Sequence, residues 1–170
     1  MTTTTHRTQL LNHEQVMQKI RRIAFEIYEN NFEESEIVLA GVWDRGYWVA
    51  ELLQKHIEAI SHLKVILVRV TIDKLSPHTS PVGFDLDKSL LQGKAVIVID
   101  DVLNTGRTLV YGLSSFFGVQ VKKLELAVIV DRGHHQYPIA AKYVGYVLST
   151  TLTEHIEVVL DADGFGVYLH

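Results

Sequence analysis

The chain has 170 residues, of which 47% are apolar and 21% charged, with 16 basic and 20 acidic side chains. This composition is typical of one globular domain with a substantial core and excludes an intrinsically disordered chain. The absence of cysteine excludes disulfides, thiolate metal sites and a cysteine nucleophile, and the net charge of −4 argues against a surface coated in basic groups for nucleic acid.

The sequence also predicts where the protein resides. No apolar run approaches the roughly 18 residues needed to cross a bilayer. The first seven residues, MTTTTHR, lack the apolar segment of a secretory signal peptide. We therefore expect a cytoplasmic protein with no membrane partner.

Polar composition and helical periodicity describe the first third of the chain. Residues 1–10 are polar and contain many threonines, so we expect a disordered tail followed by a single domain over residues 11–170. Apolar residues recur at helical spacing over residues 16–28, with Asn12 as a candidate N-cap, and again over residues 49–60. Two helices are therefore predicted, one before and one after the first strand.

Short apolar runs predict the strands of the domain, at residues 37–41, 64–70, 95–99, 124–130, 143–148 and 156–160. A third helix is predicted from Leu109 to its end near Gly118, and the polar stretch 71–93 predicts a long flexible loop. Strands that alternate with helices indicate an α/β fold with a mainly parallel sheet, flanked by helices and joined by right-handed crossovers.

The most informative stretch is VIVIDDVLNTGRTL, residues 96–109. A buried strand brings Asp100 and Asp101 to its carboxyl end, where α/β proteins place their ligands. The turn that follows opens a helix, and Gly106 allows the backbone to bend tightly and approach a ligand. The free N–H groups and hydroxyls of such a turn, together with the helix dipole, favour a phosphate.

Carboxylates beside a phosphate-binding turn suit a ligand with two different parts. In a phosphorylated sugar, the ribose hydroxyls would donate hydrogen bonds to the carboxylates while the turn holds the phosphate. Neighbouring carboxylates also suit a Mg²⁺ ion that bridges sugar and phosphate oxygens. The order of the segment therefore predicts a sugar-phosphate site.

The segment resembles the ribose-5-phosphate-binding motif of type I phosphoribosyltransferases, which use phosphoribosyl diphosphate (PRPP) as donor. Residues 41–46, GVWDRG, lie where that family has its diphosphate-binding loop. Residues 130–134, VDRGH, and 143–145, YVG, are similar to the pyrimidine operon attenuator/uracil phosphoribosyltransferase branch. The resemblance covers roughly residues 11–165 and implies the phosphoribosyltransferase fold.

The resemblance also implies a role for each matching residue. The ribose hydroxyls and Mg²⁺ would be bound by Asp100 and Asp101. The other PRPP-binding residues would be Asn104, Thr105, Gly106, Arg107 and Thr108. The diphosphate would be held by Asp44, Arg45 and Gly46. The nucleobase would be recognised by Asp131, Arg132, Tyr143 and Val144, with the tyrosine ring stacked on the base.

Two positions and one loop depart from the family pattern. Position 104 is Asn where purine-using relatives carry an acid, which disfavours a purine and leaves no obvious general acid or base. The catalytic residue is therefore not identified, and the candidates are Arg45 and Asn104. Asp44 puts a carboxylate in the diphosphate loop, which is repulsive unless it pairs with Arg45 or turns away. Loop 71–93 replaces the family's lid, and its candidate diphosphate contacts are Lys74, Ser76, His78, Thr79 and Ser80.

The resemblance leaves three functions open. The first is an enzyme that transfers 5-phosphoribose from Mg²⁺–PRPP to a pyrimidine, with uracil giving UMP and diphosphate. The second is a UMP-sensing attenuator that binds RNA, and the third is a purine phosphoribosyltransferase. PRPP and a nucleobase are the expected partners, and a homodimer or larger homo-oligomer is expected from the family.

Overall fold

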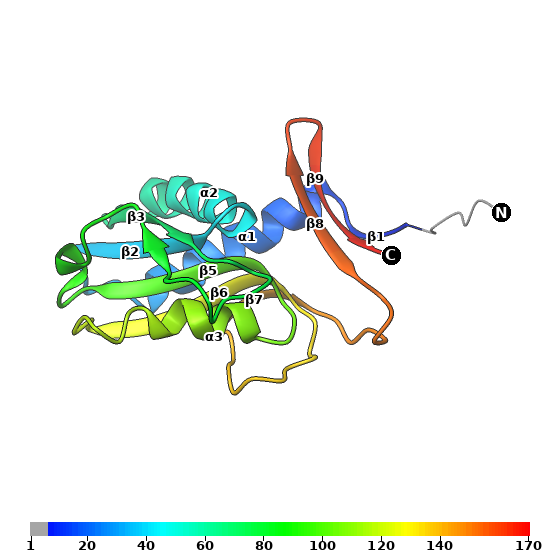
Figure 1. Cartoon of the computed structure of the whole chain (residues 1–170). Helices are drawn as coiled ribbons and strands as arrows, with labels where there is room; N and C mark the ends of the chain where they lie inside the picture. Colours follow the sequence, from blue (N-terminus) through cyan, green and yellow to red (C-terminus); the bar gives the residue numbers. More distant parts are fainter. Residues whose placement is uncertain (1–6) are drawn as a thin grey trace.

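Unbroken apolar runs form the centre of a six-stranded sheet in the computed structural model, which describes residues 7–170 (Figure 1). All nine residues of β5 are buried, because strands flank it on both sides and helices cover both faces. The strand order is β4-β3-β2-β5-β6-β7, and every neighbouring pair is parallel except β3 with β4. The strands span Glu36–Val42 (β2), Lys64–Thr71 (β3), Gly83–Phe84 (β4), Ala95–Leu103 (β5), Lys123–Asp131 (β6) and Tyr143–Val147 (β7).

Helices cover the two faces of this sheet. On one face, α1 (His13–Glu29) and α2 (Arg45–Ile60) pack on side chains such as Ile97 and Ile99 of β5. On the other, α3 (Arg107–Ser114) packs on Val96 and Val98 (Figure 1). Each such fully buried aliphatic side chain contributes about 1.5–3 kcal/mol relative to an exposed one. The predicted cap of the first helix is confirmed, because Asn12 forms a capping box with Gln15.

A second, antiparallel sheet stands beyond the carboxyl ends of the parallel strands (Figure 1). Its order is β1-β9-β8, with bounds Thr8–Leu11, Gly164–Leu169 and Ile156–Asp161. The predicted tail over residues 1–10 is therefore wrong for residues 8–10, which pair with the last strand of the chain. Residue 7 belongs to no strand, and residues 1–6 lie outside the described residues.

The predicted loop 71–93 contains more regular structure than expected. The chain turns back after β3, so that Phe84 of β4 pairs with Val70, and a 3₁₀ helix, η1, follows at Lys88–Leu91. The buried side chains of Ile72 and Leu91 explain why both ends of the segment are fixed. The longest irregular stretch is thereby reduced to residues 72–82. Among the described residues, no helix has the length and apolar character that a membrane crossing requires.

Candidate active site

The sheet topology creates a crevice at the carboxyl ends of β2 and β5. From β2 the chain passes through α2 to β3 on one side of the sheet, and it then crosses to β5 on the other side of β2. Loops that leave two adjacent parallel strands in opposite directions leave room for a ligand between them. A cavity of about 260 Å³ lies here, lined by Arg45, Lys74, residues 100–109 and Ile156.

Two carboxylates form the floor of the cavity at the end of β5. Asp100 and Asp101 are 4% and 9% exposed, and each accepts a hydrogen bond of 2.9 Å from the backbone N–H of the next residue. Burial, followed by repulsion from Asp101, raises the pKa of Asp100 well above its usual range, and Lys74 opposes that rise. A cation or ribose hydroxyl donors placed here would relieve the same repulsion.

The turn after the carboxylates is held in one tight conformation. Gly106 has φ +85°, and a Cβ at this position would lie 2.3 Å from Cγ2 of Ile139. The backbone carbonyl of Thr105 accepts hydrogen bonds from the N–H groups of Gln136 and Tyr137, at 2.8 and 3.1 Å. Because α3 begins at Arg107, the turn presents a helix N-terminus to the cavity, as a phosphate site requires.

The predicted diphosphate loop faces this turn across the cavity. Gly46 packs directly on β5, since a Cβ there would lie 2.4 Å from the carbonyl oxygen of Ile99. The Arg45 guanidinium lies 3.9 Å from Oδ2 of Asp101. Asp44 follows a cis peptide bond after Trp43, is exposed, and makes no side-chain cap hydrogen bond to α2. The structure thus brings Arg45 to the cavity, whereas Gly46 is buried against β5 and neither Gly46 nor Asp44 lines the cavity.

The loop between β3 and β4 also reaches the cavity. Lys74 lines it, and Nδ1 of His78 lies 3.4 Å from the Arg107 guanidinium. Of the polar candidates in this loop, these two are therefore close to the predicted phosphate and diphosphate positions.

The predicted base-binding residues separate into two groups. Asp131 and Arg132 lie at the carboxyl end of β6, but their side chains are already engaged. Asp131 Oδ1 accepts hydrogen bonds from the backbone of Gly133 and from His135. Arg132 is 8% exposed and donates to Thr150, Thr151 and Glu154 and, at 3.4 Å, to Oδ1 of Asn104. Arg132 therefore fixes the loop beside the cavity.

The predicted base-binding role of Tyr143 and Val144 is corrected by the structure, because neither residue lies at the cavity. Tyr143 is 1% exposed and pairs with Ala127 of β6. Ala127 lies four residues before the end of β6, so at roughly 3.3 Å per residue the pair is about 13 Å from the carboxyl edge of the sheet, where the cavity lies. Its hydroxyl donates to Glu125. The carbonyl of Val144 accepts a hydrogen bond of 2.9 Å from Arg22, and Val144 pairs with Val128 inside the sheet.

Sequence reasoning missed two residues of β8. Ile156 lines the cavity, and its half-buried side chain packs on the core. Glu157 lies 3.8 Å from the Arg45 guanidinium. No local motif marks either residue, because the second sheet places them beside β5 only after the whole chain has folded.

The donor set at the cavity fits a Mg²⁺ ion that is bound together with a substrate. Among the described residues, no group of three or more His, Asp or Glu side chains is placed to hold a metal by itself. Mg²⁺ commonly uses one or two carboxylates together with substrate phosphates and water. Asp100 and Asp101 supply such a pair.

Comparison with known proteins agrees with this geometry. Residues 6–163 match the phosphoribosyl transferase domain. The bifunctional protein PyrR of Fusobacterium nucleatum is 35% identical, and the match covers 91% of this chain and 92% of that protein. The bifunctional protein PyrR of Haemophilus ducreyi is 38% identical, and the match covers 88% of this chain and 87% of that protein. A hypoxanthine-guanine phosphoribosyltransferase structure from Bacillus anthracis has a TM-score of 0.71 at 26% identity, covering 84% of this chain and 83% of its own.

The resemblance predicted from residues 41–46, 96–109, 130–134 and 143–145 is confirmed by these matches, as is the α/β fold with its mostly parallel sheet. The chain belongs to the phosphoribosyl transferase domain family.

Proposed function

We propose that the protein transfers 5-phosphoribose from Mg²⁺–PRPP to uracil, which yields UMP and diphosphate. The observation that supports this most strongly is the composition of one cavity. Two buried carboxylates, a phosphate-type turn at the start of α3 and an arginine on the opposite loop all line it. These are the groups that a sugar with a 5-phosphate and a diphosphate leaving group requires.

Each group has a distinct task in the proposed reaction. Asp100 and Asp101 accept hydrogen bonds from the ribose hydroxyls, and residues 105–108 donate to the 5-phosphate. The bond between C1 and the diphosphate oxygen breaks with its electron pair on the diphosphate, and Arg45 stabilises the negative charge that accumulates there. The Mg²⁺ ion, when bound, screens the charge of the diphosphate. A nitrogen of the base then bonds to C1 with its electron pair, and the proton that this nitrogen carried passes to a diphosphate oxygen or to water.

The assignment to uracil rests on the base side of the cavity and on the relatives. Asn104 provides a neutral amide whose Oδ1 faces Arg132, which leaves the amide N–H groups for a carbonyl oxygen of a base. Ile156 offers an apolar surface for a planar ring. The PyrR relatives support the pyrimidine branch at 35–38% identity.

A second function is favoured by the name of those relatives, which calls them bifunctional. The chain would then also bind UMP as a signal and bind RNA in an attenuator of pyrimidine genes. RNA affinity that falls steeply with salt concentration is the property that such a role requires.

The test is nucleotide formation from Mg²⁺–PRPP with uracil, hypoxanthine, guanine, adenine and orotate offered in parallel. We expect UMP alone, and a loss of about 30- to 150-fold in kcat/KM for PRPP in Asp101→Asn, because one charged contact is worth roughly 2–3 kcal/mol. Glu51→Gln, which removes an exposed carboxylate from α2, is the matched control and should be unchanged. Purine nucleotides would overturn the assignment to uracil. UMP binding without any product would favour the attenuator.

A further inference from the structure

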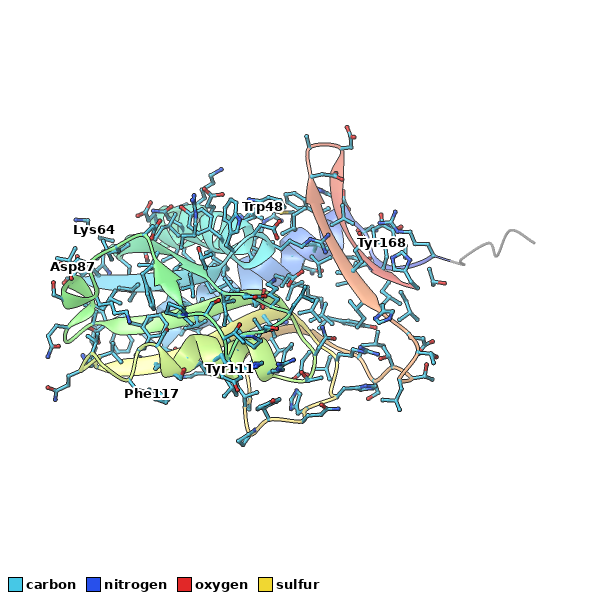
Figure 2. The ribbon with its side chains drawn as sticks, in the orientation of Figure 1. Trp48, Lys64, Asp87, Tyr111, Phe117 and Tyr168 are labelled. Carbon is cyan, nitrogen blue, oxygen red and sulfur yellow. The ribbon has the colours of Figure 1, made fainter. Side chains whose placement is uncertain are left out.

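Arg45 lies at the junction of two cavities. It lines the 260 Å³ cavity with Asp101, and it also lines a more open cavity of about 700 Å³ between α2 and the second sheet. Trp48 of α2 and Tyr168 of β9, both labelled in Figure 2, line that larger cavity as well. A rotation of the Arg45 side chain therefore moves its positive charge toward one cavity and away from the other.

Two carboxylates on opposite sides determine that direction. The Nη1 atom of Arg45 lies 3.9 Å from Oδ2 of Asp101, and its Nη2 atom lies 3.8 Å from Oε1 of Glu157. Both separations exceed the 2.7–3.2 Å of a good N–H···O hydrogen bond. Among residues 7–170, no hydrogen bond uses the Arg45 guanidinium, so its N–H groups remain available to an incoming anion.

Glu157 is itself fixed from the other side. Its Oε2 atom accepts a hydrogen bond of 3.2 Å from Arg7, which precedes β1, and lies 2.9 Å from Nε2 of His170 at the end of the chain. The Arg7 guanidinium also lies 3.7 Å from the ring centroid of Tyr168. These contacts occupy Oε2 of Glu157, so that Oε1 is the carboxylate oxygen that faces Arg45. The positive charge of Arg7 also reduces the repulsion between Glu157 and an approaching anion.

We propose that Glu157 is a positioning residue that holds Arg45 ready for the diphosphate of PRPP. The inference rests on the proposed function, in which Arg45 binds that group. Without the Glu157 carboxylate, Asp101 is the remaining partner within 4 Å, and the guanidinium turns toward it. That pairing withdraws Arg45 from the diphosphate and occupies a carboxylate that the ribose needs.

The experiment is a double-mutant cycle on the full chain with Mg²⁺–PRPP and uracil. We expect Glu157→Gln to lower kcat/KM for PRPP about tenfold and to leave KM for uracil within twofold. In an Arg45→Gln background the same change should have no further effect, because Glu157 acts through Arg45. Asp163→Asn is the matched control, since it removes one exposed carboxylate from the turn between β8 and β9, and it should stay within twofold.

Glu157→Asp keeps the charge but withdraws it by one methylene, and it should show an intermediate loss even if the Gln variant folds poorly. Calorimetric binding of Mg²⁺–PRPP separates the possible failures. Wild-type protein that does not bind Mg²⁺–PRPP overturns the proposed function and this inference together. Wild-type protein that binds it, with a Glu157→Gln variant equal to wild type or a tenfold loss that persists in the Arg45→Gln background, overturns this inference alone.

Discussion

The proposed phosphoribose end and the proposed base end of the cavity are built in different ways. Residues 100–108 come from the end of one strand, one turn and the start of one helix, so neighbours in sequence are neighbours in space. The proposed base end combines Asn104 with Arg132, which directly follows β6, and with Ile156 of β8. These residues belong to separate segments and to both sheets. The residues of a contiguous motif can be assigned to a site from their order in the sequence. A surface assembled from distant segments depends in addition on strand register and on the contacts between those segments.

The variant with the largest expected effect is Gly106→Ala, which tests the contiguous end of the cavity. A methyl group would collide with Ile139, and the positive φ adds about 1–2 kcal/mol of strain. A displaced turn should lower kcat/KM for PRPP by about 100-fold, since a shift on the order of 1 Å in a binding group has such an effect. Steady-state kinetics and thermal unfolding measure the two effects.

Gly112→Ala is the matched control for that variant. Gly112 lies in the same helix with open space around its Cα, so alanine should stabilise the protein by about 0.5–1 kcal/mol and leave the kinetics unchanged. Full activity in Gly106→Ala would contradict the phosphate role of the turn.

At the base end, Ile156→Ala should raise KM for uracil about tenfold with little change in KM for PRPP. The variant removes apolar contact area beside Asn104 that is worth roughly 1–3 kcal/mol to a bound ring. Val159→Ala, on the same strand but lining the larger cavity, should leave both constants unchanged. If the KM for PRPP rises instead, Ile156 belongs to the sugar side and the division of the cavity is wrong.

The same contrast explains which predictions from sequence succeeded. The buried strands followed from unbroken apolar runs, and the positions of Asp100, Asp101 and residues 105–108 beside one cavity followed from their order. Strand β1 was missed because its partner, β9, lies at the other end of the chain. Tyr143 was misplaced because the register of β7 against β6 depends on the irregular segment between them, which periodicity does not describe.

A smaller effect tests whether Tyr143 belongs to the core. Tyr143→Phe removes a buried hydrogen bond to the Glu125 carboxylate, so we expect a loss of about 1.5–3 kcal/mol in the free energy of unfolding with an unchanged KM for uracil. Tyr111→Phe is the control, because the hydroxyl of Tyr111 makes no hydrogen bond among the residues described. Tyr111 belongs to α3 and is labelled in Figure 2. A raised KM for uracil without lost stability would return Tyr143 to the base site.

The smallest expected effect appears at alkaline pH. Burial, together with the neighbouring Glu125 carboxylate, raises the pKa of Tyr143 well above its ordinary value of 10. The unfolded chain therefore releases this proton near pH 10 while the folded protein keeps it, so the stability contributed by the neutral hydroxyl is complete below pH 10 and decreases above it.

The difference in unfolding free energy between wild type and Tyr143→Phe should accordingly narrow by about 0.8 kcal/mol between pH 8 and pH 10.5. Urea unfolding of both proteins at a series of pH values measures it, and titration of the other tyrosines and lysines cancels in the difference. A constant difference through pH 10.5 would mean that the hydroxyl ionises equally in both states. Tyr143 would then be accessible to solvent, as a residue of the base site would be, and the contrast between the two ends of the cavity would lose one of its main supports.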